Sequence, residues 1–560
     1  MTTIDTRPVA DAAAGKSATA PALGDTSAFF AGVAAWSTTT DHKKIGRLYI
    51  GFGLLSLLAG AALGALLGLE KAASDALVDS GSLLQLIQGH RVALVFGALL
   101  PLTLGLSVAI VPLQLGARSI AFPRVVLTGF YAWLGGMGLT VAALLRNGGA
   151  GGGNEQAVDL FLVGNGLMML GLLASAGCVA TSVLTTRAPG MTMRRVPLFA
   201  WSSLVGSLGL VLVLPVGFGT IIYLIIDHRL GISANFGGSE GVGAWMSFLY
   251  TVPAVIAFAV PAVGVAAELI PVTFRTRQPM RGVKFAGIAL VGVAALSAVT
   301  RQFVSPVTID SDQTFQAFVE DLVPFLVFAG LPLLGLVVAL GLGALTARQG
   351  LKRGKPTVSP GFVFAFLGLL MIGLGILGNV VQSITDLELI GTSYEEGATL
   401  YVVYGATIMM LGGLVFWAPK LWGVVLPTKA VLPLALLGAL GTVLASGSLY
   451  LAGFLGAPGG IPTNEIAVKA LLDTSYSGSA ELLAILSAIG HALVAITGLA
   501  FAGLLMKTVR NGGATDANPY HGHTIEWMAS SPAPEHNFEH VPTVASAEPQ
   551  FDLTYEGTRA

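Results

Sequence analysis

The chain lacks histidine over most of its length, and it has very little cysteine. Its eight histidines are His42, His90, His228, His491, His521, His523, His536 and His540. The interval between positions 228 and 491 therefore offers no imidazole, the side chain on which metal and haem centres buried in a membrane depend. The single cysteine, Cys178, excludes a disulfide framework, and its apolar surroundings predict a small packing residue.

Charged residues are also scarce. Only 11% of the 560 residues are charged, 54% are hydrophobic, and the mean hydropathy is +0.79. A soluble domain carries about 25% charged residues, so this deficit indicates that lipid is the solvent for most of the chain. The net charge of -1 gives no basic field for a nucleic acid, and we expect no partner of that class.

Twelve apolar runs of about 20 residues are long enough to cross a bilayer. They lie near 46–69, 92–115, 125–145, 158–184, 197–226, 245–272, 283–304, 322–346, 361–385, 399–418, 430–455 and 481–507. A β-barrel would show alternating segments of about 10 residues instead. The continuous runs therefore predict an all-α membrane protein with twelve transmembrane helices.

The charges of the loops predict the orientation of these helices. Basic residues follow the second, fourth, sixth, eighth and twelfth runs, whereas two of the intervening loops, near 310–321 and 386–396, are acidic. Because basic loops stay in the cytoplasm, both termini are expected there, and we expect a multi-pass protein of the inner (plasma) membrane.

Two polar tails flank the apolar region. Residues 1–38 are rich in Ala, Thr, Pro and Asp, and we expect a disordered cytoplasmic tail. The spans and the turn before them occupy 39–510. Residues 511–560 are polar and hold four histidines in a spacing that fits no standard zinc pattern, so we expect a solvated cytoplasmic tail there.

Four short motifs carry a resemblance to a known family. They are Thr39-Thr40-Asp41-His42-Lys43-Lys44-Ile45-Gly46, Val111-Pro112-Leu113-Gln114-Leu115-Gly116-Ala117 with Ala121-Phe122-Pro123-Arg124, Arg187-Ala188-Pro189-Gly190-Met191-Thr192-Met193, and Ile525-Glu526-Trp527 through Pro532-Ala533-Pro534-Glu535-His536-Asn537-Phe538. Together they resemble subunit I of the haem-copper terminal oxidases, of the cytochrome c oxidase type found in actinobacteria. The resemblance covers nearly the whole chain. It implies a twelve-helix fold, haem and copper, and a family activity of cytochrome c oxidation, oxygen reduction and proton pumping in aerobic respiration.

The positions that carry this chemistry in the family hold other residues here. Only His90 remains, as a possible ligand of the low-spin haem. The copper ligands of the family correspond to Val252, Thr300 and Arg301, and the two haem histidines of the tenth span correspond to Gly397 and Thr399. A slip of one residue would replace the last two by Ala398 and Leu400. We expect His90 to be an interfacial histidine, with Arg91 facing water, and His491 to make a hydrogen bond within the bundle.

These substitutions predict a catalytically inactive member of the family, with no copper and no haem bound. The leading hypothesis is an assembly, regulatory or structural component of a respiratory complex, with other oxidase subunits and the lipid bilayer as partners. One alternative is a haem-binding oxidase with an unusual ligand set. Another is a transporter or channel on the same scaffold. Arg301 is a further candidate, as a functional charge near the end of a span that pairs with Asp310 or extends to the surface.

Overall fold

The structure is a computed structural model that describes residues 25–73, 75–149, 152–230, 245–300, 307, 313–459 and 478–556. The chain divides into two compact units, Met1–Thr39 and Thr40–Ala560. The first contains helix α1 (Asp25–Ser37). The expectation of disorder throughout 1–38 is therefore wrong for residues 25–37.

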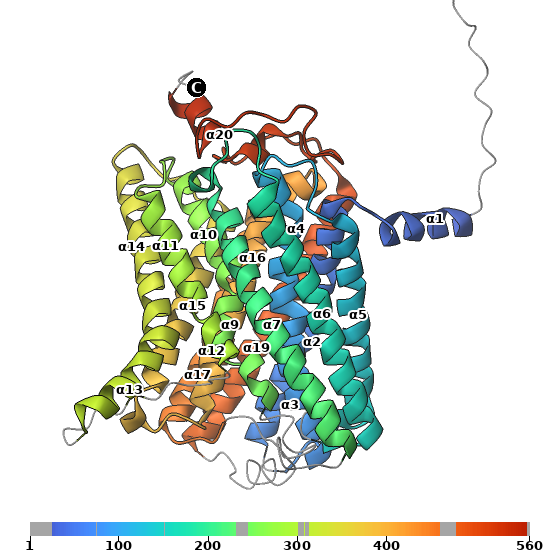
Figure 1. Cartoon of the computed structure of the whole chain (residues 1–560), viewed down its shortest axis with the longest axis vertical. Helices are drawn as coiled ribbons and strands as arrows, with labels where there is room; N and C mark the ends of the chain where they lie inside the picture. Colours follow the sequence, from blue (N-terminus) through green and yellow to red (C-terminus); the bar gives the residue numbers. More distant parts are fainter. Residues whose placement is uncertain are drawn as a thin grey trace, which may run out of the picture. The chain divides into compact units, whose positions relative to one another are not determined.

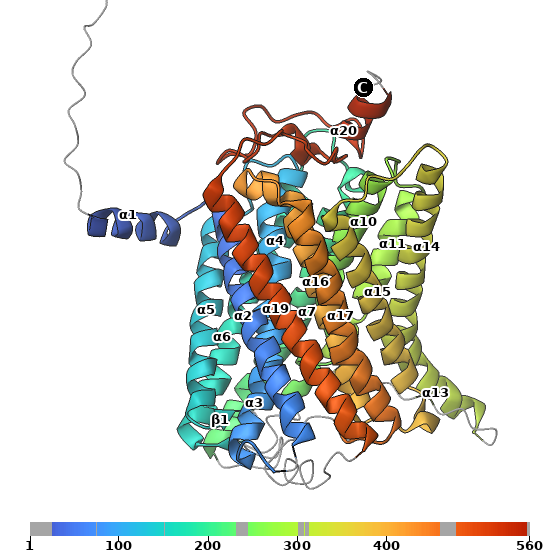
Figure 2. The same cartoon turned by 180° about the vertical axis from the view of Figure 1, so that it is seen from behind.

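The second unit is a bundle of long helices that run side by side (Figures 1 and 2). Twelve helical segments of the described residues are long and apolar enough to cross a membrane, which confirms the predicted fold. The spans are α2 (His42–Ala72), α3–η1–α4 (Ser80–Val92, Ala93–Leu99, Leu100–Gln114), α5 (Pro123–Leu145), α6 (Glu155–Thr185), α7 (Leu198–Leu230), η3–α9–α10 (Ser247–Leu249, Ala254–Phe258, Val260–Thr273), α11–α12 (Arg281–Gly292, Ala295–Val299), α13–η4–α14 (Phe315–Phe325, Leu326–Gly330, Leu331–Leu351), α15 (Pro360–Gln382), α16 (Ser393–Trp422), α17 (Thr428–Phe454) and α19 (Ser479–Asn511).

The shorter elements lie between or after the spans. They are the two-residue strands β1 (Gly148–Gly149) and β2 (Gly152–Gly153), which pair as an antiparallel hairpin, the 3₁₀ turns η2 (Met193–Arg195), η5 (Thr385–Leu387) and η6 (Ile525–Met528), and the C-terminal elements α20 (Pro549–Phe551) and η7 (Asp552–Glu556).

Side-chain caps begin several of the spans. The Asp41 carboxylate accepts the backbone N–H of Lys43 at 3.0 Å and caps α2, and the Asn154 side chain caps α6 by accepting the N–H of Ala157. Such caps satisfy amide groups that a helix leaves without a partner in its first turn. These polar residues therefore set where the apolar helices begin.

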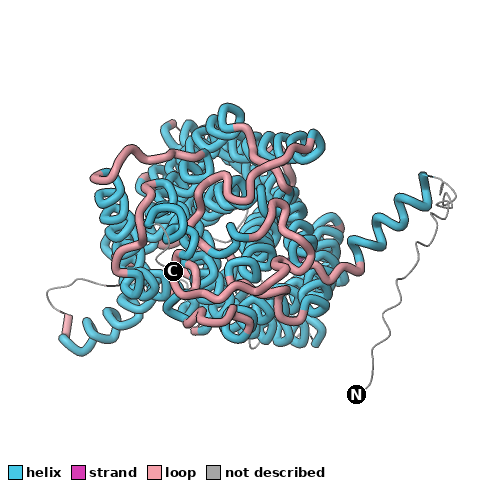
Figure 3. The backbone as a smooth tube through the Cα atoms, turned by 90° about the horizontal axis from the view of Figure 1, so that it is seen from above, coloured by secondary structure: helices cyan, strands magenta, loops and turns pink. Residues whose placement is uncertain are grey.

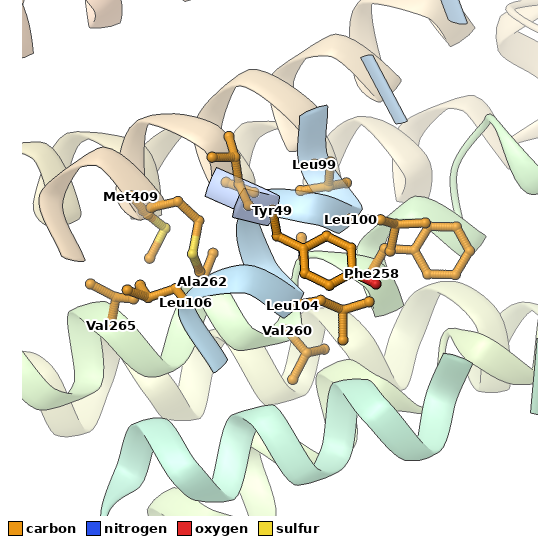
Figure 4. Packing of buried hydrophobic residues seen from close by; sticks show 14 of the residues in the cluster. Tyr49, Leu99, Leu100, Leu104, Leu106, Phe258, Val260, Ala262, Val265 and Met409 are labelled. Carbon is orange, nitrogen blue, oxygen red and sulfur yellow. The ribbon is translucent and has the colours of Figure 1, made fainter. Parts of the chain in front are cut away.

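The second, sixth and tenth spans form the centre of the bundle. The most apolar 18-residue window of each is buried to 100%, 94% and 100%, respectively, whereas the windows of the other nine are buried to between 39% and 61%. Figure 3 shows the surrounding helices from above. Aliphatic and aromatic side chains from α2, α4, α10 and α16 fill much of this centre, among them Tyr49, Leu106, Val265 and Met409 (Figure 4).

Glycines let neighbouring spans approach closely. On α5, a methyl group added to Gly136 would lie 2.5 Å from the carbonyl oxygen of Gly164 on α6. At a second contact between the same two helices, a methyl group added to Gly171 on α6 would lie 2.3 Å from the carbonyl oxygen of Gly129 on α5. The backbones therefore meet without side chains between them, as small residues allow in lipid.

The C-terminal segment, residues 513–556, lies across one end of the bundle (Figure 1, red). Ile525, Glu526 and Trp527 are buried, and Asn537 is fully buried. The expectation of a solvated tail is wrong for this segment because its polar groups find partners on the ends of the helices.

Candidate functional site

His90 lies in the last turn of α3, in the centre of the bundle. Its side chain is 2% exposed. Its Nδ1 lies 2.8 Å from the carbonyl oxygen of Gly60 on α2. A carbonyl only accepts, so Nδ1 carries the proton and donates it, and Nε2 is the nitrogen that faces the interior. The His90 ring is therefore buried between helices, and its expected interfacial depth stays a prediction.

Glu396, in the first turn of α16, lies opposite His90. One carboxylate oxygen is 3.8 Å from His90 Nε2, and the other is 3.5 Å from a guanidinium nitrogen of Arg91. The Arg91 side chain is only 9% exposed, so the prediction that it faces water is wrong. The buried cation has a carboxylate partner, which is the arrangement that makes a charge tolerable inside a membrane.

A second imidazole joins this cluster from the last span. The ring of His491 on α19 lies 5.3 Å from the ring of His90, centre to centre, in an edge-to-face arrangement. His491 Nδ1 is 2.6 Å from the hydroxyl of Tyr404 on α16. This bond confirms the predicted hydrogen bond of His491 within the bundle. The polar cluster therefore connects α2, α3, α16 and α19.

A small cavity adjoins the cluster. Its volume is about 30 Å³, and its lining includes His90, Glu396, Thr399 and Leu400. Such a volume holds about one water molecule. It lies far below the ~300–1,000 Å³ of sites for larger ligands. A haem bound through His90 would therefore require Glu396 and its neighbours to move.

The structure brings two of the predicted positions together. The backbone N–H of Val252, just before α9, donates to the hydroxyl of Thr399 on α16 at 3.3 Å. Val252 is 2% exposed. A valine side chain offers no donor atom, whereas copper in such a site requires nitrogen or sulfur ligands. The residue at this copper position does not fit the metal.

The face of α16 that carries Gly397 is directed away from this site. A side chain built on it would meet the carbonyl oxygen of Ser446 and the ring of Tyr450, both on α17. The cavity side of α16 instead carries Glu396, Thr399, Leu400 and Val403, which follow the spacing of one helical face. The one-residue slip considered for this span therefore places one of its positions, Leu400, at the cavity.

The remaining predicted positions lie elsewhere. Thr300 is exposed just after α12, where its hydroxyl donates to the carbonyl oxygens of Leu296 and Ser297. Arg301 and its suggested partner Asp310 lie outside the described residues. Among the ranges that the structure does describe, no group of three or more His, Cys, Asp or Glu side chains is placed to hold a metal ion.

A separate polar site lies where the C-terminal segment meets the bundle. Glu526 Oε1 accepts hydrogen bonds from Thr524 at 2.8 Å and from Gln114 and Trp417 at 3.1 Å. Burial raises the pKa of Glu526, although these three donors oppose the shift. Close by, Glu268 accepts the backbone N–H of Phe199 at 3.3 Å.

Asn537 anchors the same segment. Its side-chain oxygen lies 3.0 Å from both His42 Nε2 and Lys43 Nζ, and its side-chain nitrogen donates to the carbonyl oxygen of Ala117 at 2.7 Å. The motif around His42 and the motif around Asn537 therefore form one contact, although 495 positions separate these two residues.

Glu396 is the residue that sequence reasoning missed, since it was assigned to an acidic loop. A signal was present: Glu395 and Glu396 directly precede an apolar run, and an ionisable residue at the edge of a span marks a functional or structural site. Its partners Arg91 and His90 lie some 300 positions earlier, so the sequence did not identify the pairing.

Comparison with known proteins gives consistent results. Residues 44–493 match the family model described as cytochrome c and quinol oxidase polypeptide I. The chain is 27% identical to cytochrome c oxidase subunit 1 of Corynebacterium diphtheriae, over 94% of this chain and 93% of that protein. It is 25% identical to cytochrome c oxidase subunit 1 of Bacillus subtilis, over 91% and 82%. A solved heme-copper terminal oxidase dimer has the same fold, with a TM-score of 0.63, 16% identity and 85% coverage of both chains.

These matches correct one expectation. The absence of cofactors was predicted from the missing histidines alone. The matching family is that of the haem-copper oxidases, which bind haem and copper, and nothing in the structure demonstrates that both are absent. The prediction of a cofactor-free protein is therefore withdrawn, and the misfit described above concerns only the residues at the copper position.

Proposed function

Because this chain belongs to the haem-copper oxidase subunit I family, we propose that it is a membrane scaffold of a respiratory complex that does not reduce oxygen at the copper position of the family. The observation that carries the proposal is the buried pair of Val252 and Thr399. Two groups without metal-binding nitrogen atoms lie in contact where the resemblance requires ligands. Function follows from such a site and not from the fold alone.

The scaffold role is supported by what the structure retains. The C-terminal segment binds the ends of several helices through Glu526 and Asn537, so this face is well ordered for contacts with other subunits. The role is assembly, regulation or structural support. In this proposal both termini, including the tails 1–38 and 511–560, face the cytoplasm, in agreement with the basic loops.

Oxygen uptake and copper content of the purified protein test the proposal. We expect no oxygen uptake with reduced cytochrome c and co-purification with other respiratory subunits, and the copper content shows whether any uptake arises at a copper site. A matched variant, Val252→Leu, should change neither measurement. Oxygen reduction with about one copper per chain would contradict the proposal, as would loss of uptake in Val252→Leu.

A second candidate is a haem-binding member with an unusual ligand set, and the neighbouring rings of His90 and His491 favour it. His90 also holds its Nδ1–H on a backbone carbonyl, as metal-bound histidines do. The absorption spectrum distinguishes this candidate: a low-spin haem band that is lost in His90→Ala would support it. A colourless protein with correct folding would contradict it.

The transporter alternative has less support. A transport path needs polar residues along the central spans, and the windows of the second and tenth spans are wholly buried against their neighbours. The polar cluster at His90 occupies only the end of these spans near the start of α16.

A further inference from the structure

A groove opens on the side of the bundle between α2, α3 and α5. Its volume is about 790 Å³, within the range of sites for small amphiphilic molecules. The wall is apolar along most of its length and includes Ala59, Leu63, Met137 and Leu144. All three helices cross the membrane, so the open side of the groove faces lipid.

The groove has the length of one lipid leaflet. Along α5 it extends from Met137 to Leu145, which is roughly 12 Å at the rise of an α-helix. One leaflet contributes half of the ~30 Å hydrocarbon core. The groove ends where α5 ends, near β1, at the face opposite the C-terminal segment (Figure 2).

The end of the groove near the membrane surface is polar and has a fixed geometry. Gln85 is 6% exposed, and its Nε2 donates to Asn147 Oδ1 at 3.3 Å. The backbone of the β1–β2 hairpin packs closely against the Gln85 side chain, because a methyl group added to Gly149 would lie only 2.2 Å from Gln85 Oε1. Oδ1 of Asn147 accepts this bond, so the bond does not use the side-chain N–H groups of this groove-lining residue.

A positive charge lies at the same end. Arg146 is exposed, and although it does not itself line the groove, its two neighbours in the chain, Leu145 and Asn147, both do. Within the described part of the chain it forms no ion pair with an acidic side chain. A guanidinium on an exposed side chain next to Asn147 in the sequence can reach a phosphate group at the mouth of the groove, and a phosphate accepts several hydrogen bonds and carries the opposite charge.

We propose that this groove is a binding site for an anionic glycerophospholipid, with one acyl chain along α2, α3 and α5 and its phosphate at Arg146 and Asn147. The apolar walls, about as long as one leaflet, accept the acyl chain. The Asn147 amide, which is held by its bond to Gln85, and the charge of Arg146 select the anionic headgroup. The site is independent of the function proposed above, because none of its groups belongs to the His90 cluster.

Two variants separate the headgroup contact from the groove itself. Arg146→Gln removes the charge at an exposed position. Gly89→Leu fills the groove, because a side chain at Gly89 points toward Leu144 and Leu63, whose nearest atoms lie 3.4 and 3.6 Å from an added methyl group. Gly138→Leu is the matched control on α5, since an added methyl group there meets no atom within 4 Å.

The measurement is native mass spectrometry of the full chain after exchange into vesicles of equal phosphatidylglycerol and phosphatidylcholine. We expect the wild type and Gly138→Leu to retain phosphatidylglycerol preferentially. Arg146→Gln should lose about fivefold of that preference. Gly89→Leu should retain less of both lipids, with circular dichroism as the check on folding.

Equal retention of the two lipids by the wild type would overturn the proposal. So would an unchanged preference in Arg146→Gln, or the retention of a neutral isoprenoid in place of a phospholipid. Because Arg146 is exposed, its substitution does not threaten folding, and the headgroup contact remains testable even if Gly89→Leu fails to fold.

Discussion

The centre of the bundle and its C-terminal face bury charge in different ways. In the centre, the carboxylate of Glu396 approaches both Arg91 and His90. At the face, Lys420 Nζ donates to the carbonyl oxygens of Ala517 and Ala529 at 2.7 and 2.6 Å, and Glu526 Oε1 accepts hydrogen bonds from three uncharged side chains. The central cluster therefore brings opposite charges together, whereas Lys420 and Glu526 at the face bind uncharged groups.

The largest expected effect comes from removing Glu396. Glu396→Leu removes the carboxylate that lies 3.5 Å from the buried Arg91 guanidinium, and the free energy of unfolding should fall by about 3–5 kcal/mol. Thermal unfolding in detergent measures the change. Asp386→Ala, at an exposed position, is the control and should have little effect.

The double variant Arg91→Leu with Glu396→Leu sharpens the comparison. Replacing both members of a buried pair by apolar residues is often neutral or stabilising, so much of the lost stability should return. If the double variant is less stable than Glu396→Leu alone, the two residues do not act as a pair, and the contrast between centre and face fails.

A smaller effect is expected at the face. Asn537→Ala removes the partners of His42, Lys43 and the Ala117 carbonyl, and should cost about 2 kcal/mol. Faster hydrogen exchange in residues 530–545 should accompany it. Glu535→Ala is the control, because Lys43 binds the backbone oxygen of that residue and not its side chain. Equal exchange in both variants would contradict the role of Asn537.

The buried His523 should make the free energy of unfolding depend on pH in the acidic range. Burial lowers its pKa to about 3, and a contribution from His521 acts in the same direction. The unfolded chain binds a proton near pH 6.5 and the folded chain does not, so stability should fall as the pH decreases from about 6.5 toward 3. In His523→Phe, measured by thermal unfolding across this range, the dependence should be weaker. A parallel pH profile would exclude His523 as its source.

Glu526 should act in the opposite direction and is the smallest effect of the set. Its pKa is raised by burial, so the folded chain holds the proton above the ordinary carboxyl pKa of about 4.3. Stability should therefore decrease as the pH rises from that value through the raised pKa. Glu526→Gln keeps an oxygen for the three donors and should flatten this part of the profile. A steeper decline would contradict the assignment.

The twelve spans could be predicted because each is a continuous apolar run, and such a run by itself indicates a helix that crosses the lipid bilayer. The resemblance in the four motifs was likewise local, and the family matches confirm it. The position of Glu396 could not be predicted, since an acidic residue next to a span reads equally well as loop or interior. Only the packing of α3 against α16 decides between the two.

The C-terminal segment shows the same limit in another form. Its composition is that of a solvated tail, yet Glu526 and Asn537 are buried because donors from distant helices converge on them. Composition indicates what a segment can bury alone. It does not indicate the partners that other parts of the chain provide.

The contact between His42 and Asn537 also has a consequence for biosynthesis. His42 opens the first span, and Asn537 follows the last, so the ribosome adds these two groups 495 residues apart. The first span thus enters the membrane with its polar end lacking this partner until Asn537 emerges. A nascent chain that stops early would expose that end, which gives quality-control proteases a chemical mark of incompleteness.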